Sequence, residues 1–133
     1  MGEVYLWPAK PAADAMGRLL VHCATGPEHP TRAALAFRVA RMALEQGHQV
    51  DVFLAGDALA LLRPQTRNAV VGVGTGPLAE HYAAIVGLGG RLYASRFSAE
   101  ARGITADLSP DVKLVDPDRL IELLFAADRS VTY

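Results

Sequence analysis

The run Arg18–Ala24 (RLLVHCA) is the feature that most limits what this chain can fold into. Five of its seven residues are apolar, and they follow one another almost without a break. Alternating polar and apolar residues are typical of a strand with one face in water, whereas a continuous apolar run predicts a strand buried on both faces. Strands of this kind belong to parallel sheets whose two faces are covered by helices.

A helix and a second strand are predicted to follow. Pro30 suits the first turn of a helix, and Gly47 is a stop signal at its end. Between them, apolar residues of 31–46 recur at helical spacing, with arginines and a glutamate on the opposite side. The run Gln49–Ala55 predicts the second strand, so the three elements form a right-handed βαβ unit. We expect the helix to bury Leu35, Phe37, Val39, Ala40, Met42 and Leu44.

The rest of the chain continues this alternation of strands and helices. We expect a short helical piece at 58–62, a loop-rich segment at 64–76, a helix from Pro77, a strand at 91–94, a helix ending at Gly103, a loop at 105–110, a strand at 112–115, a helix capped by Asp116 and a strand at 130–133. The last helix is predicted to bury Leu120, Ile121, Leu123, Leu124 and Ala127. The order predicts an α/β fold, a three-layer α/β/α sandwich on a mainly parallel sheet.

The domain is predicted to cover residues 18–133, after an N-terminal arm over residues 1–17. Pro8 and Pro11 interrupt any strand in this arm. It is interpreted either as a partly ordered segment or as an edge strand or a segment packed on a neighbouring subunit. Tyr5 and Trp7 suit such contacts, because aromatic residues are enriched at interfaces.

The composition bears on partners and on compartment. Lys and Arg number 13 against 14 Asp and Glu, which argues against a basic surface for nucleic acid or for a membrane. No apolar run approaches the roughly 20 residues of a membrane span, and the start of the chain lacks a signal-peptide pattern. Cys23 is the one cysteine, so no intrachain disulfide can form. We therefore expect a cytoplasmic location.

The stretch Gly89–Ile104 carries the richest group of candidate site residues. Ser95 stands where a strand gives way to a helix, at the sheet edge where open α/β sheets bind ligands. With Ser95 as the N-cap, Ser98 lies on the same turn. Free N–H groups, the two hydroxyls and the guanidinium groups of Arg96 and Arg102 would form an anion pocket. The alternative is plain helix capping by serine, since the sequence names no general base for the hydroxyl.

The loop after the first strand lies at the same edge. Gly26, Glu28 and His29 are candidate ligand-binding residues, with Glu28 and His29 as a proton-transfer pair or as hydrogen-bonding groups. The alternative is a solvated loop that tethers the first helix. His48 and His81 are predicted to lie on the surface. The glycine-rich stretch 72–77 lacks the spacing of a nucleotide-binding fingerprint and predicts a flexible loop.

Cys23 is interpreted first as a buried, apolar-like side chain and alternatively as a reactive thiol. Its neighbour His22 points to the opposite face of the strand, so the two cannot ligate one ion without a bulge. No cysteine–histidine spacing typical of zinc is present. We predict no metal site and no cofactor.

In four segments the sequence resembles the DsrE/DsrF-like family of small α/β proteins. These are the first strand with its Gly-Pro-Glu loop, the sequence EQGHQVDVFLAGDAL, the helix start PLAEH and the sequence LYASRFSAEARGI. The resemblance implies a five-stranded sheet and assembly into dimers, trimers or hexamers. In the family's sulfur-relay members, a cysteine at the end of the strand before the Arg-Gly helix carries persulfide sulfur. That position is Ser95 here.

Three functional hypotheses follow from this resemblance and from the departure at position 95. The first is a cytoplasmic homo-oligomer whose Ser95 pocket binds a small anion or the sulfur-carrying segment of a relay partner. The second is a sulfurtransferase or thiol-redox protein that uses Cys23, beside Glu28 and His29. The third is an inactive structural subunit of a sulfur-relay complex, paired with an active paralogue.

Overall fold

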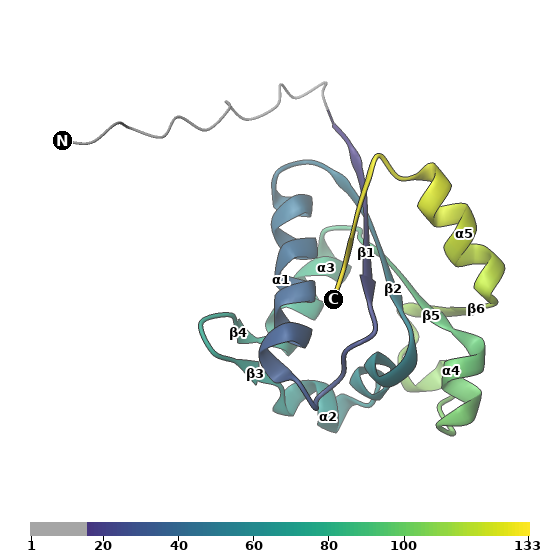
Figure 1. The fold of residues 1–133 in the computed structure, drawn as a ribbon. Coiled ribbons are helices and arrows are strands. Elements are labelled where there is room, and N and C mark those ends of the chain that lie inside the picture. Colours follow the sequence, from purple (N-terminus) through teal and green to yellow (C-terminus); the bar gives the residue numbers. More distant parts are fainter. Residues whose placement is uncertain (1–15) are drawn as a thin grey trace.

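The computed structural model describes residues 16–133 and arranges them around one five-stranded sheet (Figure 1). Its strands run in the order β6-β5-β2-β1-β7, and all neighbours are parallel. The predicted α/β sandwich on a parallel, five-stranded sheet is therefore confirmed. The strands are β1 (Arg18–Cys23), β2 (Gln49–Leu54), β5 (Arg91–Ser95), β6 (Val112–Val115) and β7 (Arg129–Thr132).

Helices cover both faces of the sheet (Figure 1). On one face α1 (Pro30–Glu45) packs beside α3 (Leu78–Gly87), and on the other lies α5 (Pro117–Ala126). The 3-10 helix η1 (Gly56–Leu62) and α4 (Arg96–Ala101) follow the carboxyl ends of β2 and β5. The first described strand, β1, begins at Arg18, and residues 1–15 of the predicted arm lie outside the described residues.

The two faces of the sheet are buried to very different extents. Val21, Val52 and Leu54 point toward α1 and α3 and belong to the main core. The face under α5 has a much smaller core, because one ten-residue helix covers it. Its buried residues are Leu20, Phe53, Tyr93 and Leu123. Fewer buried apolar residues therefore lie on this face than on the face under α1 and α3.

The segment 64–76 differs from its prediction as a loop. Pro64 begins a short helix, α2 (Pro64–Ala69), because proline fits the first turn of a helix as well as it ends one. A hairpin of β3 (Val71–Gly72) and β4 (Gly76–Pro77) follows. Arg38 and His81 bond to the backbone carbonyls of Gly74 and Thr75, at 2.8 and 2.6 Å. His81 is therefore buried by the hairpin, and its prediction as a surface residue is wrong.

Three predictions within helices and loops also need correction. In α1 the buried residues are Phe37 and a set of alanines, while Met42 is exposed, because small side chains allow close packing against α3 and the sheet. In α5 Ile121 and Leu124 are exposed although their burial was predicted. That helix meets the sheet through Leu123 and its flanks, and no second helix lies beside it in the described part of the chain. The predicted loop 105–110 contains a short 3-10 turn, η2 (Ala106–Leu108).

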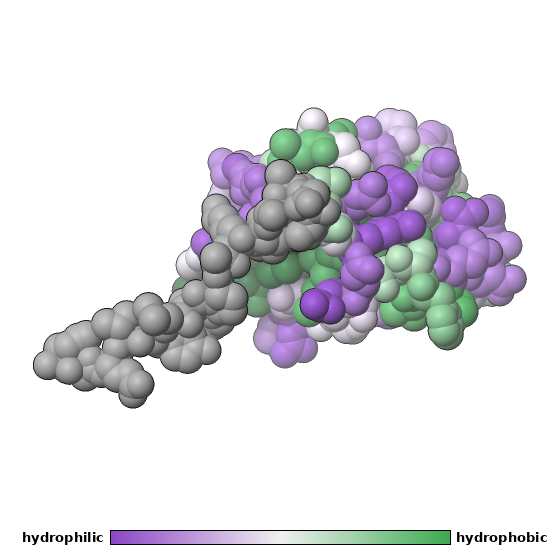
Figure 2. All heavy atoms as spheres, turned by 90° about the horizontal axis from the view of Figure 1, so that it is seen from above, coloured by the Kyte–Doolittle hydropathy of each residue, from purple (hydrophilic) through white to green (hydrophobic). Residues whose placement is uncertain are grey.

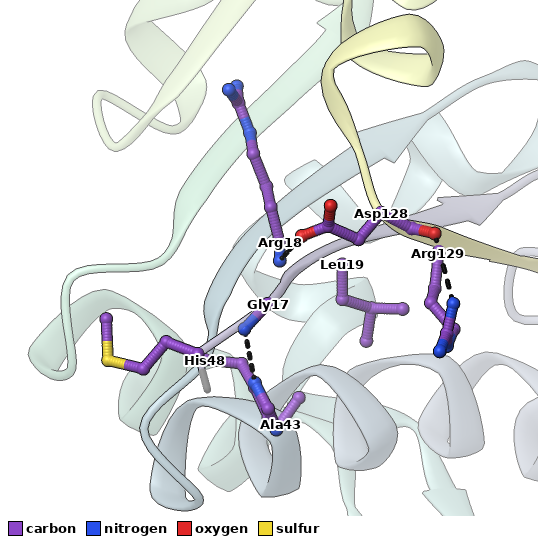
Figure 3. A pocket seen from close by; sticks show the side chains of 8 residues that line it. Gly17, Arg18, Leu19, Ala43, His48, Asp128 and Arg129 are labelled. Carbon is purple, nitrogen blue, oxygen red and sulfur yellow. Dashed lines mark hydrogen bonds between the residues drawn. The ribbon is translucent and has the colours of Figure 1, made fainter. Parts of the chain in front are cut away.

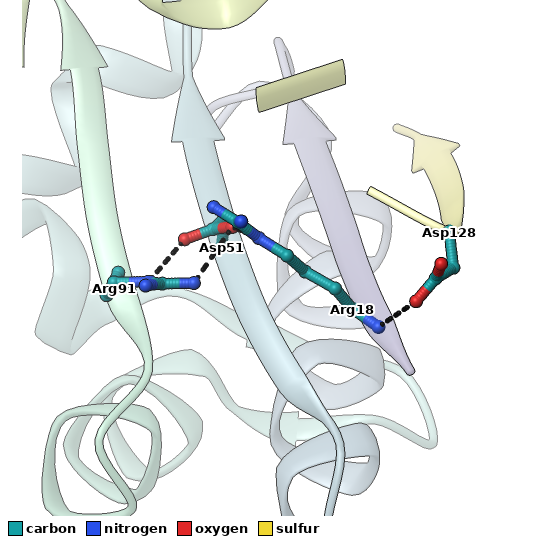
Figure 4. A network of polar contacts seen from close by, with 4 residues as sticks. All are labelled: Arg18, Asp51, Arg91 and Asp128. Atoms are coloured by element: carbon teal, nitrogen blue, oxygen red, sulfur yellow. Dashed lines mark hydrogen bonds and ion pairs between the residues drawn. The ribbon is translucent and has the colours of Figure 1, made fainter. Parts of the chain in front are cut away.

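A buried carboxylate joins three strands near their amino ends (Figure 4). Asp51 of β2 is 1% exposed, and its oxygens accept hydrogen bonds from Arg18 Nε at 2.9 Å and Arg91 Nε at 2.7 Å. Arg91 lies directly beside Asp51 in the β2–β5 register. The two guanidinium groups remain partly exposed, so the pair of cations compensates the buried charge while staying in contact with water.

None of the helices in residues 16–133 combines the length and the apolar character needed to cross a membrane.

Candidate functional site

The candidate residues lie where β1, β2 and β5 end, at the carboxyl edge of the sheet. Since β2 lies between β1 and β5, its end separates the loop that carries Gly26 from the strand end at Ser95. The residues that follow β2, Gly56 and Asp57, fill this gap and contact both sides. The site is therefore built from three strand ends, of which the sequence predictions named two.

Ser95 ends β5 and caps α4. Its backbone is extended, and its hydroxyl oxygen accepts a hydrogen bond from the backbone N–H of Ser98 at 3.2 Å. This is the N-cap geometry, which satisfies one of the free N–H groups in the first turn of a helix. The residue is 9% exposed. The predicted capping contact between the two serines is present, and it occupies one acceptor site of the Ser95 oxygen.

Ser98 turns its own hydroxyl toward the end of β2. Its oxygen accepts a hydrogen bond from the backbone N–H of Gly56 at 2.9 Å. Gly56 has a φ of +54°, the left-handed region that favours glycine, and this conformation lets the chain leave β2 toward η1. Ser98 thus fixes α4 to this turn rather than standing free for a ligand.

Arg102 completes the contact between α4 and the β2 end. Its guanidinium donates to the Asp57 carboxylate at 3.0 Å and to the Ser98 carbonyl at 3.1 Å. Its own carbonyl accepts a hydrogen bond from Arg63 at 2.8 Å. Asp57 was not predicted as a site residue, because the pairing of Asp57 with Arg102 depends on β2 lying beside β5. The position of Asp57 directly after a strand of an α/β sheet is the sequence feature that could have identified it.

Arg96 points away from this group. Its guanidinium donates to the Asp116 carboxylate at 2.9 Å and to the Leu114 carbonyl at 3.3 Å, both at the end of β6. Asp116 precedes α5 as predicted, but its side chain makes no capping hydrogen bond. The two arginines of the predicted pocket are therefore on opposite sides of α4, and each already has a carboxylate partner.

The loop after β1 reaches the same group through its backbone. A Cβ atom at Gly26 would come 2.2 Å from the Asp57 carbonyl oxygen, so the two turns are in direct contact. The Glu28 carboxylate accepts a hydrogen bond from the Gly26 N–H at 3.1 Å. His29 is exposed and precedes α1 without a side-chain capping bond. The structure thus joins Gly26, Asp57, Arg102, Ser98 and Ser95 in one chain of contacts, and Glu28 borders it.

A model of the DsrE/DsrF-like family matches residues 18–133. The chain belongs to the DsrE/DsrF-like family. The family supports a protein of the sulfur-relay type. The crystal structure of the YchN protein from E. coli has the same fold, with a TM-score of 0.73 at 19% sequence identity, and the match covers 89% of this chain and 100% of the YchN chain. No curated protein matches the chain.

The single thiol of this DsrE/DsrF-like chain is enclosed on the other side of the site. Cys23, at the end of β1, is fully buried among the residues under α1 and donates a hydrogen bond to the Thr25 carbonyl at 3.3 Å. The pKa of this thiol is raised from 9.0 to about 11, mainly by burial. The hydrogen bond to Thr25 lowers the pKa, and the negative charge of Glu28 raises it further. The thiol is therefore protonated at neutral pH and closed to solvent in this conformation.

His22 does not join Cys23. It points to the α5 face of the sheet, where its ring meets Phe53 edge-on with the ring centroids 5.8 Å apart. Burial lowers its pKa, so the ring is neutral at neutral pH. Within residues 16–133, no cluster of three or more histidine, cysteine or acidic side chains is arranged to hold a metal ion. The adjacent His22 and Cys23 thus lie on opposite faces, as their places along the strand predict.

A separate cavity lies at the amino edge of the sheet (Figure 3). Ser95 ends β5 at the opposite, carboxyl edge. Its volume is about 650 Å³, and it opens between the start of β1, the end of α1 and the start of β7. The Gly17 N–H donates to His48 Nδ1 at 2.9 Å on its wall. None of the residues that line this cavity is among the site residues predicted from the sequence. The lining residues are Met16, Gly17, Arg18, Leu19, Ala43, His48, Asp128 and Arg129.

Proposed function

We propose that this chain is a non-catalytic protein of the sulfur-relay type and a cytoplasmic homo-oligomer. It binds the sulfur-carrying segment of a relay partner at the carboxyl edge of the sheet around Ser95, Ser98, Asp57 and Arg102, which we call the Ser95 edge. The observation that carries the proposal is the Ser95 hydroxyl at the end of β5, hydrogen-bonded as a helix cap. The family resemblance assigns this position to the sulfur-carrying cysteine. An alcohol oxygen cannot replace sulfur in a persulfide, which requires a sulfur–sulfur bond.

The contacts around Ser95 favour a protein segment over a small anion. The guanidinium groups of Arg96 and Arg102 are engaged by carboxylates, and the backbone N–H groups of Gly56 and Ser98 already donate to the Ser98 and Ser95 hydroxyl oxygens. An anion would have to compete with these internal partners. In contrast, Phe97, two residues after Ser95 in the first turn of α4, leaves 60% of its surface exposed. An exposed aromatic ring beside a polar edge suits a polypeptide contact.

A transfer experiment tests the absence of sulfur chemistry. The chain is incubated with a protein persulfide donor carrying radioactive sulfur and then separated under non-reducing, denaturing conditions. We expect no covalent label on the native chain. Label that disappears in Cys23→Ala would instead establish the alternative in which Cys23 carries sulfur, and it would overturn the proposal.

A binding experiment tests the positive half of the proposal. The same donor, in persulfide and in reduced form, is titrated against the immobilised chain. We expect the persulfide form to be retained, and retention to fall in Phe97→Ser and in Ser95→Arg, where bulk and charge enter the edge. The control is Val73→Ser, which alters an equally apolar residue on the β3–β4 hairpin. Equal retention by all variants would contradict binding at this edge.

A further inference from the structure

The last helix along the chain, α5, exposes three large apolar side chains along one side. Ile121 is 53% exposed, Leu124 is 39% exposed and Phe125 is 89% exposed. Their spacing of three and four residues places them side by side on the helix, and we call them the α5 patch. Viewed from above, the molecule shows a hydrophobic area on the side where α5 lies (Figure 2). These side chains are directed away from the small core that Leu123 joins.

The α5 patch lies beside the point where the chain enters β1. Asp128, three residues after Phe125, is tied to Arg18 by two hydrogen bonds of 2.8 Å, one in each direction. The end of α5 and the start of β1 accordingly occupy the same edge of the molecule (Figure 1). Met16, two residues before Arg18, therefore lies at the same edge of the molecule as the end of α5.

The sequence before Met16 carries a short apolar segment at a suitable distance. Val4, Tyr5, Leu6 and Trp7 are consecutive, and the eight residues 8–15 separate them from Met16. Eight residues span at most about 28 Å when extended. A ten-residue helix is about 15 Å long, so the apolar segment can reach every part of the α5 patch.

The size of the α5 patch also favours this occupant over a second copy of the chain. Its exposed side-chain surface is on the order of 300 Å², judged from the area of large apolar side chains. A stable interface between two proteins buries roughly 800 Å² on each partner. Four consecutive apolar residues of one chain match the smaller area, and their covalent connection to β1 supplies a high effective concentration.

We propose that the segment Val4–Trp7 docks on the α5 patch of the same chain and covers Phe125. Docking removes apolar surface of both segments from water, which is the driving force for such a contact. The segment then takes the place of a second helix on the α5 face of the sheet. This inference does not depend on the function of the Ser95 edge.

The chain provides its own probe, because Trp7 is its only tryptophan. Fluorescence of the full-length protein therefore reports on this segment alone. We expect the native emission maximum to lie at shorter wavelength than in denaturant, with reduced quenching by acrylamide. Phe125→Ser should shift the emission to longer wavelength and increase quenching. Val73→Ser should change neither, although Val73 is as exposed as Phe125, at 88%.

Three results would overturn the proposal. The first is a native emission like that of the denatured chain, which means that Trp7 stays in water. The second is a shielded Trp7 that responds neither to Phe125→Ser nor to Ile121→Ser, which places it elsewhere, for example in the amino-edge cavity. The third is shielding that disappears on dilution, which assigns the contact to another copy. Far-ultraviolet circular dichroism checks that each variant is folded, and Ile121→Ser replaces Phe125→Ser if that variant is not.

Discussion

The hydroxyl oxygen of Ser98 lies 2.9 Å from the backbone nitrogen of Gly56 and accepts its hydrogen bond. This contact joins the first turn of α4 to the turn that follows β2. Ser98 comes three residues after Ser95, and its backbone N–H donates to the Ser95 hydroxyl, which caps α4. The two serines together therefore cap α4 and attach it to the end of β2. The polar groups at this edge therefore hold one another in place before any partner arrives.

The first prediction concerns Ser98→Ala. This change leaves the Gly56 N–H without its partner, and an unpaired, partly buried donor costs about 1–3 kcal/mol. We expect the free energy of unfolding in urea to fall by that amount. Ser130→Ala, in the exposed strand β7, is the control and should stay within about 0.5 kcal/mol of the native protein. Equal effects of the two changes would contradict a structural role for the Ser98 contact.

The second prediction concerns the contact between the β1 loop and Asp57. Gly26→Ala places a methyl group where the Asp57 carbonyl oxygen already lies, so one of the two turns must move. We expect a loss of about 1–3 kcal/mol, the usual cost of overpacking, measured by urea unfolding. Gly87→Ala is a matched control, since nothing lies within 4 Å of the added atom and alanine is the better helix former. It should leave stability unchanged or raise it.

The third prediction tests the chemistry of position 95 directly. In a Cys23→Ala background, Ser95→Cys puts the only thiol at the N-cap of α4. The Ser98 N–H and the helix start stabilise a thiolate there, so its pKa should fall below that of an ordinary cysteine. The rate of alkylation as a function of pH gives this pKa. Ser130→Cys in the same background supplies the reference thiol. A higher pKa at position 95 than at position 130 would refute the expectation.

The fourth prediction follows from the buried thiol. Cys23 has its pKa raised to about 11 in the folded protein, against an ordinary value of 9.0. Above pH 9 the unfolded chain loses this proton while the folded chain keeps it, so deprotonation favours unfolding. The stability contributed by the buried neutral thiol is present below pH 9 and is lost as the pH rises toward 11. We expect the stability of the native protein to decline over this interval more steeply than that of Cys23→Ala.

Thiol labelling provides an independent check of the same burial. At neutral pH a thiol reagent should modify Cys23 rapidly in denaturant and very slowly in the native protein. Rapid native labelling would show that the end of β1 opens to solvent, and it would restore Cys23 as a candidate nucleophile.

The fifth prediction concerns the buried carboxylate of Asp51. Arg18→Ala or Arg91→Ala each leaves it with one cationic partner and should cost about 1.5–3 kcal/mol, the range for a hydrogen bond to a charged group. The double variant leaves an uncompensated charge under the sheet, which costs about 3–5 kcal/mol or prevents folding. A double-mutant cycle in urea measures the coupling between the two arginines. Losses within about 0.5 kcal/mol in both single variants, the usual range for a surface substitution, would show that the arginines do not compensate the Asp51 charge.

Much of this fold is encoded in local patterns. The continuous apolar run of β1 predicts a strand buried on both faces, and the structure places it second from one edge of a fully parallel sheet. Likewise, a serine at a strand end with a second serine three residues later predicts the Ser95–Ser98 capping contact. These predictions succeed because capping and periodicity depend on residues that are close in sequence.

The features that were missed depend on which strands become neighbours. Asp57 pairs with Arg102 only because β2 and β5 are adjacent, and no local pattern states that adjacency. His81 is buried by the β3–β4 hairpin, and the glycine-rich sequence of this hairpin predicts only a flexible loop. The apolar spacing of α5 is real, but it does not indicate how much of that face the sheet covers, so Ile121 was placed in the core.

The position of β7 has a consequence for how this chain is made. Its residues 129–132 pair with residues 19–22 of β1, and Tyr133 exchanges backbone hydrogen bonds with His22 and Ala24, at 2.9 and 2.8 Å. During synthesis β1 leaves the ribosome first, and β7 follows more than a hundred residues later. One side of β1 therefore stays unpaired throughout translation of the domain, an open strand edge to which other chains can add. Pairing of β7 with β1 is thus a late event. Until residues 129–132 have been made, the free edge of β1 remains open to other chains.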